Sequence, residues 1–323
     1  MTTIEIKTLI REGAELHLAG RMPEAEQKYR EALMLHESNA VAHNNLGFLL
    51  AQTRKFAEAE QEYFRAMEIS PGYSTAYTNL GQTYLMVQRW SDAEEYLLKA
   101  ISLDADDFHA NESLAKLFMM QGDAQRSEFF WKKCYSLEPQ SSQLIELGHA
   151  LVAQKKLDEA LEILKNVLSE EEENPRLYSL LGIIYFAKYD FGSAITCFKR
   201  TLGMEPENTD ARHNLAMSFL KTGQSVEAVN EFRRILMLSP DHTEARNNLA
   251  VIELAADETE SALNHFNLTL EQEPKNAKAL YYKSVILFLQ GKPDEAQKTL
   301  AATIATNNPD YKAKAHEMLA TMN

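Results

Sequence analysis

The sequence predicts an all-α solenoid of about nine helix-turn-helix repeats, each of them one helical hairpin. Three observations lead to this fold class. Short motifs recur with a period of 34 residues, small and large residues recur at fixed places within that period, and prolines recur at its ends. The sequence also lacks the Gly-, Pro- and Ser-rich stretches that usually link globular domains. We therefore expect one continuous array of repeats.

The first helix of each hairpin is marked by a small residue at the eighth place of the repeat. The spacings between motifs such as Asn44-Asn45-Leu46-Gly47 and Asn79-Leu80-Gly81 are mostly multiples of 34, with one residue missing near Pro139. The eighth-place residues are Gly13, Gly47, Gly81, Ala115, Gly148, Gly182, Ala216, Ala250 and Ser284.

The second helix of each hairpin carries a small residue and then, four places later, a large apolar one. Residues four apart lie on the same face of a helix. The small residues let the two helices approach closely; they are Ala25, Ala59, Ala93, Ser127, Ala160, Ala194, Ala228, Ala262 and Ala296. The large residues are expected to fill the core; they are Tyr29, Tyr63, Leu97, Trp131, Leu164, Phe198, Phe232, Phe266 and Leu300.

The helix ends are marked by proline and glycine. Proline lacks a backbone donor and has a fixed φ, so it separates one helix from the next at the repeat boundary. The boundary prolines are Pro71, Pro139, Pro206, Pro240 and Pro274, and the turns within three hairpins contain Gly122, Gly223 and Gly291.

Together these residues resemble the tetratricopeptide repeat family over nearly the whole chain. The resemblance implies a right-handed superhelical solenoid whose concave surface holds another polypeptide. We expect repeats at about 6–39, 40–73, 74–107, 108–140, 141–174, 175–208, 209–242, 243–276 and 277–308, with a capping helix at 309–323. A flexible break is expected near residue 140, where the array changes register.

The composition narrows the classes of partner. The formal net charge of −14 disfavours binding to nucleic acid and to anionic membrane surfaces. No apolar segment reaches the roughly 18 residues that span a bilayer, and the N-terminus lacks the features of a signal peptide. We expect a cytoplasmic protein without direct membrane insertion, in which Cys134 and Cys197 are buried free thiols.

The sequence contains no motif for catalysis. A phosphate-binding glycine loop, a nucleophile elbow and metal-type His or Cys spacings are all missing. We therefore expect no enzyme activity, no cofactor and no metal site.

Candidate binding residues lie on the stripe of the first helices that the resemblance places on the concave side. Amide side chains can pair with an extended peptide backbone, because each offers a donor and an acceptor. The polar candidates are Asn44, Asn45 and Asn79 near the N-terminal end and His213, Asn214, Asn247 and Asn248 near the C-terminal end.

Four of these asparagines match a ladder that grips the ligand backbone in peptide-binding members of the family, such as the repeat region of the O-linked N-acetylglucosamine transferases. They are Asn45, Asn79, Asn214 and Asn248. Ser113, Glu146 and Leu180 interrupt the ladder in the middle of the chain. The alternative is that the asparagines are only tolerated polar residues of the repeat consensus.

The same stripe carries apolar candidates, namely Phe48, Met86, Met120 and Phe186. Methionine adapts to varied apolar partners because it is flexible and polarizable. The alternative is that these side chains pack between neighbouring first helices.

These features predict a non-catalytic scaffold or adaptor that binds an extended or helical segment of one or more partner proteins. Bacterial members of the family serve in pilus assembly, secretion and envelope biogenesis, so the resemblance suggests a pathway of that kind. The alternative is a self-assembling homo-oligomeric scaffold, because exposed apolar ends of solenoids associate readily.

Overall fold

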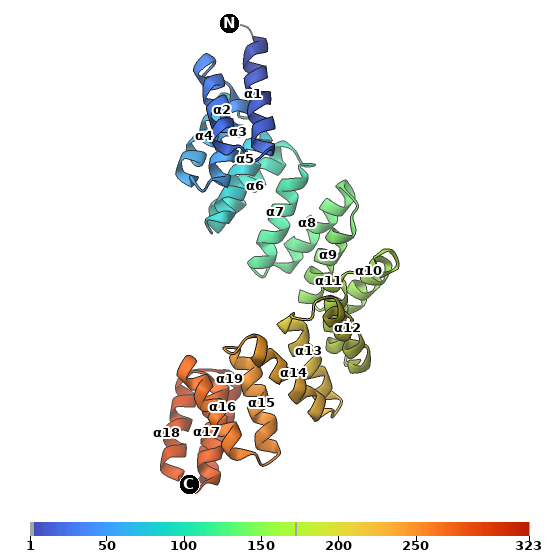
Figure 1. The fold of residues 1–323 in the computed structure, drawn as a ribbon, viewed down its shortest axis with the longest axis vertical. Helices are drawn as coiled ribbons and strands as arrows, with labels where there is room; N and C mark the ends of the chain where they lie inside the picture. Colours follow the sequence, from blue (N-terminus) through green and yellow to red (C-terminus); the bar gives the residue numbers. More distant parts are fainter. Residues whose placement is uncertain (1–2, 172, 323) are drawn as a thin grey trace. The chain divides into compact units, whose positions relative to one another are not determined.

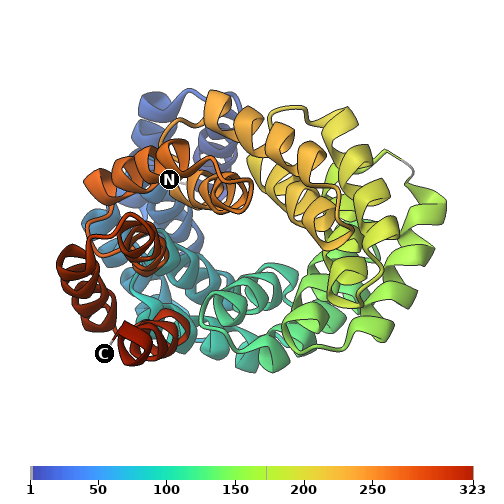
Figure 2. The same cartoon turned by 90° about the horizontal axis from the view of Figure 1, so that it is seen from below.

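The computed structural model describes residues 3–171 and 173–322, so Met1, Thr2, Glu172 and Asn323 lie outside it. This part of the chain is built from nineteen α-helices and contains no strand, which confirms the all-α prediction. Consecutive helices form hairpins that follow one another along the chain (Figure 1; Figure 2).

The chain divides into two compact units, Met1–Val167 and Leu168–Asn323, and the division falls inside α10. This division differs from the flexible break that the sequence predicts near residue 140. Residue 140 lies in the loop between α8 and α9, and flexibility there stays a prediction.

Unit 1 is built from five first helices and their partners. The first helices are α1 (Thr3–Leu18), α3 (Ala40–Gln52), α5 (Ser74–Met86), α7 (Phe108–Met120) and α9 (Ser141–Ala153). The second helices are α2 (Met22–Leu35), α4 (Phe56–Ile69), α6 (Trp90–Leu103), α8 (Ala124–Leu137) and α10 (Leu157–Glu170).

Unit 2 contains four further hairpins and a last helix. The first helices are α11 (Pro175–Ala187), α13 (Thr209–Lys221), α15 (Thr243–Ala255) and α17 (Ala277–Leu289). The second helices are α12 (Phe191–Met204), α14 (Ser225–Leu238), α16 (Thr259–Gln272) and α18 (Pro293–Ala305), and α19 (Pro309–Met322) follows them.

Polar N-caps start several of the first helices. The side chains of Asn39, Asp107, Asn174, Asn208 and Asn276 each accept a hydrogen bond from the backbone N–H three residues further on. These bonds satisfy backbone donors that have no partner inside the helix.

A residue with left-handed backbone conformation follows the first helix of each hairpin in the described part of the chain. Glycine occupies this place four times, with φ between 74° and 80°, as Gly20, Gly122, Gly223 and Gly291. Other residue types hold the same conformation with φ between 61° and 64°, as Arg54, Gln88, Lys155, Tyr189 and Asp257. The turn geometry is thus kept even where the side chain disfavours it.

The core of each hairpin is a large side chain of the second helix packed against a small residue of the first. The large residues are all buried, and the small ones that precede them by four places are fully buried, as predicted. A Cβ added to Gly47 would lie 2.9 Å from the Tyr63 ring, and one added to Gly182 would lie 2.6 Å from the Phe198 ring. The eighth place is therefore small because the facing ring occupies the space.

The last helix packs against α17 and α18. Ala315 is fully buried there, and the ring of Tyr311 lies 5.7 Å from that of Tyr281. Helix α19 thus covers the last hairpin. Cys134 and Cys197 are buried free thiols, as predicted, and burial raises the pKa of both.

The Gly182 contact predicts a stability effect that a nearby glycine does not share. Gly182→Ala is expected to lower the free energy of unfolding by about 1–3 kcal/mol, because the new methyl group must displace Phe198. The control is Gly203→Ala in α12, where an added Cβ meets no atom within 4 Å. Losing a helical glycine there should stabilise by about 0.5–1 kcal/mol. Urea unfolding followed by circular dichroism measures both; equal effects of the two variants would contradict the packing.

Candidate functional site

Most successive first helices within a unit contact one another. In unit 1, α1 contacts α3, α3 contacts α5 and α5 contacts α7; in unit 2, α11 contacts α13 and α15 contacts α17. Successive second helices make no comparable contact in the described part of the chain. The side on which helices lie closer together is the inner side of a stack, so we call the surface of the first helices the inner face.

Large apolar side chains are exposed on the inner face of unit 1. Besides Ile4 and Val41 near the starts of α1 and α3, they are Leu18, Phe48, Met86 and Met120, one from each of α1, α3, α5 and α7, with exposed fractions of 91%, 40%, 58% and 67%. Leu18, Met86 and Met120 hold the same place in their repeats, since multiples of 34 residues separate them. We call these four side chains the apolar row.

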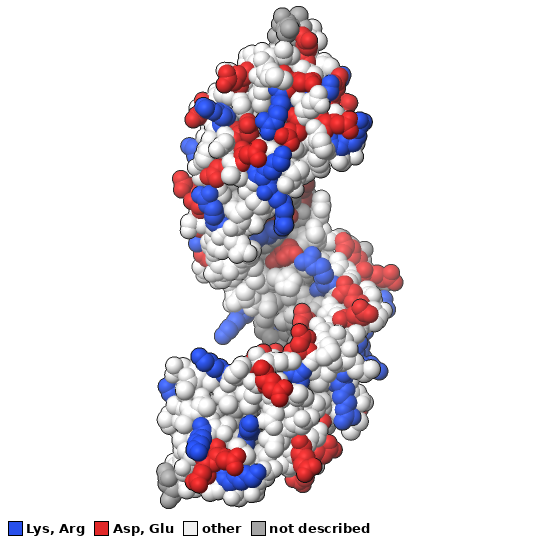
Figure 3. All heavy atoms as spheres, turned by 60° about the vertical axis from the view of Figure 1, so that its left-hand side comes forward, with Lys and Arg blue, Asp and Glu red and all other residues white. Residues whose placement is uncertain are grey.

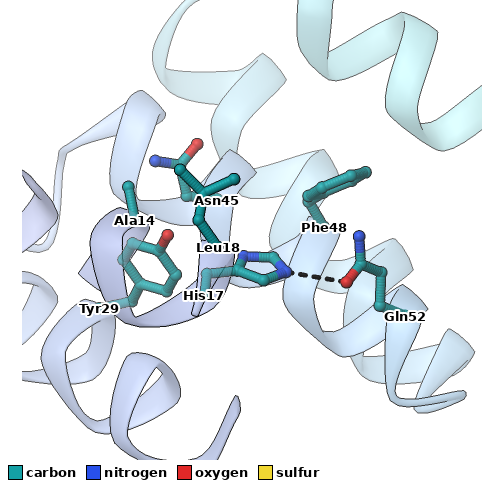
Figure 4. A pocket seen from close by; sticks show the side chains of 7 residues that line it. All are labelled: Ala14, His17, Leu18, Tyr29, Asn45, Phe48 and Gln52. Atoms are coloured by element: carbon teal, nitrogen blue, oxygen red, sulfur yellow. Dashed lines mark hydrogen bonds between the residues drawn. The ribbon is translucent and has the colours of Figure 1, made fainter. Parts of the chain in front are cut away.

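The first two members of the apolar row line a pocket of about 410 Å³ between α1 and α3, together with Ala14, His17, Tyr29, Asn45 and Gln52. In Figure 4 the His17 ring points toward Gln52, and His17 Nε2 lies 2.9 Å from Gln52 Oε1. The His17 and Phe48 rings lie 5.5 Å apart. The pocket therefore combines an apolar lining with amide groups.

The asparagine side chains of unit 1 differ in their exposure and in their hydrogen bonds. Asn44 is only 4% exposed, and its Oδ1 accepts a hydrogen bond of 2.9 Å from Asn79 Nδ2, which ties α3 to α5. Asn44 Nδ2 donates in turn to Asn45 Oδ1 at 3.3 Å. The Asn45 amide N–H groups have no partner among the described residues, and Asn45 lines the pocket.

In unit 2, Asn247 is 2% exposed and its Nδ2 donates to Oδ1 of Asn276, the N-cap of α17, at 3.1 Å. This amide would have to give up that bond in order to bind a peptide. Asn214 is half-buried, and its side chain makes no hydrogen bond within the part of the chain that the structure describes.

Asn248 belongs to a polar cluster on α13, α15 and α17. Its Nδ2 lies 3.1 Å from His213 Nε2, and its Oδ1 accepts from Lys278 Nζ at 2.5 Å. The His213 ring stacks on that of His242 with 6.1 Å between centroids. Burial lowers the pKa of His213 and that of Lys278. His213 therefore favours its neutral form, which accepts the Asn248 hydrogen bond.

Phe186 is half-buried in the core of unit 2, where its ring lies 5.2 Å from that of Phe191. It is the least accessible of the four apolar candidates. Sequence reasoning missed Leu18, His17 and Gln52. The repeat register could have found Leu18, because this residue holds the same place as Met86 and Met120.

The described residues contain no group of three or more His, Cys, Asp or Glu side chains that could hold a metal ion. In the same part of the chain, no helix is both long and apolar enough to cross a membrane.

Family models match three parts of the sequence. Residues 37–106 and 253–320 match two tetratricopeptide repeat models, and residues 136–255 match the C-terminal ARM domain of tetratricopeptide repeat protein 21. The chain belongs to the tetratricopeptide repeat family and carries multiple repeats. Folds of this class serve as scaffolds for protein–protein interaction. No curated protein matches the chain significantly by sequence.

Solved structures show the same fold at low sequence identity. A chain from the APC/C hetero-tetramer Cut9–Hcn1 is 18% identical with a TM-score of 0.60; the match covers 89% of this chain and 57% of that one. PilF of Pseudomonas aeruginosa is 19% identical with a TM-score of 0.55, over 62% of this chain and 92% of that one. Human IFIT1, solved as a dimer with m7Gppp-AAAA, is 14% identical with a TM-score of 0.51, over 95% and 91%.

The hydrogen bonds separate asparagines with a structural role from free ones. Asn79→Ala is expected to lower the free energy of unfolding by about 1–3 kcal/mol, because it leaves the buried Asn44 Oδ1 without its donor. Asn214→Ala serves as the matched control and should change stability by less than about 0.5 kcal/mol. Thermal or urea unfolding checks both variants. A neutral Asn79 variant would mean that the bond between α3 and α5 contributes nothing.

Proposed function

We propose that the chain is a non-catalytic adaptor that binds an extended or helical segment of a partner protein on its inner face. The observation that carries this proposal is the apolar row of unit 1. Large apolar side chains exposed on successive first helices, three of the four in register, favour a binding surface, because water contact with them is unfavourable.

The pocket between α1 and α3 suits an anchoring side chain of the bound segment. Leu18, Tyr29 and Phe48 offer apolar contact, while Asn45 and Gln52 stand at the same pocket with amide groups. Such groups can pair with the backbone on either side of the anchor. Met86 and Met120 would continue the contact along α5 and α7, where their flexible side chains can adapt to the partner.

Unit 2 offers polar contacts on α13 and α15, while its first helix α17 exposes the apolar side chains Phe288 and Leu289 at its end, 42% and 68% exposed. Asn214 is the ladder residue whose amide is free, and it is our first candidate there for a backbone contact. His213 and Asn248 are candidates whose existing hydrogen bonds to one another would have to rearrange. We infer that unit 1 supplies more of the apolar contact, because its apolar row extends over four first helices whereas Phe288 and Leu289 lie on one.

A protein partner fits the charges better than a nucleic acid does. The net charge is −14, and on the face drawn in Figure 3 the Lys and Arg side chains are interspersed with Asp and Glu. Nucleic-acid binding needs cations gathered against phosphates. The likeness to IFIT1 concerns the fold, and its ligand m7Gppp-AAAA is not carried over to this chain.

For the biological setting, we propose a cytoplasmic role in a bacterial assembly, secretion or envelope pathway. The family resemblance and the fold shared with Pseudomonas aeruginosa PilF support this proposal. The identity of the captured partner tests it.

The experiment compares an inner-face variant of three substitutions with a control variant of two in a tagged pull-down with quantitative mass spectrometry. The first replaces Phe48, Met86 and Met120 by Glu on the inner face. The control replaces Met34 and Phe129 by Glu; these residues are 79% and 65% exposed on the second helices α2 and α8. Burying an apolar side chain contributes about 1.5–3 kcal/mol to binding. The inner-face variant should therefore recover more than tenfold less partner than the unmodified protein, while the control should recover the same amount.

Equal recovery of partners by both variants would contradict the inner-face proposal. The second candidate function is self-assembly into a homo-oligomeric scaffold, favoured by the 75% exposed Ile4 at the start of α1. Sedimentation velocity over a range of concentrations separates the two functions. A monomer at every concentration would remove self-assembly, and a concentration-dependent oligomer without any other partner would favour it.

A further inference from the structure

His43 joins three segments of unit 1 from a nearly buried position. It lies in α3 and is 8% exposed. Its Nε2 lies 2.8 Å from the backbone oxygen of Glu37, in the loop after α2, and its Nδ1 lies 2.5 Å from Glu62 Oε2 in α4. The imidazole therefore bridges the start of its own hairpin to the loop before it and to the second helix.

Both partners of the ring are oxygens that accept hydrogen bonds. A backbone carbonyl can only accept, and an ionised carboxylate can only accept as well. A neutral imidazole carries a single N–H, so one of the two contacts would then bring two lone pairs together. The full set of bonds needs one more proton, whether the ring holds it or shares it with Glu62.

Other repeats make the same contact with a different side chain. At the place of His43, Tyr77 and Asn111 donate to the carbonyl oxygen six residues earlier, each at 3.2 Å. Arg212 and Arg246 donate in the same way to the carbonyl oxygens of Pro206 and Pro240. This contact is therefore a recurring tie between a first helix and the loop that precedes it.

Arg212 reproduces both bonds of His43. One of its terminal nitrogens donates to Pro206 O, and the other donates to Glu231 Oε2 at 2.5 Å. Glu231 follows Arg212 by nineteen residues, as Glu62 follows His43. A guanidinium keeps its charge at all physiological pH values, whereas an imidazolium does not. Unit 1 thus has a titratable group where unit 2 has a permanent cation.

We infer that His43 is a proton-dependent latch of unit 1, which holds hairpin α3–α4 to the loop after α2 while protonated and releases it as the pH rises. This inference concerns the stability of unit 1 and does not depend on the proposed function.

The charged groups around the ring come from the neighbouring elements. Arg30 of α2 and Glu37 line the same pocket as His43 and Glu62, and Arg65 of α4 repels a charged ring. Helix α5, which packs on α3, has no charged residue. In α1, which also contacts α3, the described ion pairs point elsewhere: Arg11 pairs with Glu15, and Glu12 pairs with Lys28.

These surroundings set the direction of the pH dependence. Burial acts to lower the pKa of His43, but the hydrogen bonds to Glu62 and to the Glu37 carbonyl outweigh it and raise the pKa above its usual value. A raised pKa in the folded state adds stability that is complete below the unfolded value of about 6.5. That stability is lost as the pH rises through the higher folded value.

The first test is an NMR titration of the histidine rings in the unmodified protein. The His43 ring is expected to titrate above about pH 6.5, the usual value for histidine. Titration at or below that value would overturn the inference, because the ring would then gain nothing from its proton. This measurement needs no variant.

The second test compares the unmodified protein with His43→Arg by amide hydrogen exchange, corrected for intrinsic rates, at about pH 6 and about pH 8.5. After this correction, the backbone amides of residues 36–43 in the unmodified protein should exchange about threefold to tenfold faster at the higher pH than at the lower one. His43→Arg should exchange equally at both, because it carries the charge that Arg212 carries in unit 2. The same pH dependence in both proteins would overturn the latch, since other groups would then cause it.

Discussion

The packing of one large side chain against one small residue is the constraint on which the rest of the structure depends. At Gly13, Gly47, Gly81 and Gly182 the facing side chain leaves no room for a Cβ. A ring or a leucine that fits this closely fixes both the distance between the two helices and the place where they cross. Because the same contact recurs at each hairpin, the array repeats one geometry rather than building nine separate ones.

This geometry also decides which surface stays open. The large residues of the second helices point into the hairpins and are buried, so they cannot serve a partner. The first helices lie close together and are packed from both sides, which leaves only a narrow stripe of each at the surface. In unit 1 that stripe carries Leu18, Met86 and Met120 in register, and apolar side chains there gain most from a partner that excludes water.

The sequence predicts the hairpins because the steric requirement recurs at the same two places in every copy. For Met86 and Met120 the sequence leaves two alternatives open, exposure or packing between first helices, and the structure has them 58% and 67% exposed. The sequence does not predict the hydrogen-bond partners of the polar side chains. Asn44 and Asn79 occupy neighbouring first helices, and only the distance between those helices decides that the two amides bond to each other. For the same reason the repeat pattern alone does not reveal the double contact of His43.

The most direct test of an open inner face is methionine oxidation by limiting peroxide in the isolated protein, read by peptide mass spectrometry. Met86 and Met120 are 58% and 67% exposed, the control Met34 on a second helix is 79% exposed, and Met67 in the core is 8% exposed. Met86 and Met120 should react about as fast as Met34 and roughly tenfold faster than Met67, since oxidation follows exposure. If Met34 reacts while Met86 and Met120 stay as slow as Met67, the inner face is already covered, by another copy or by a segment of the chain itself.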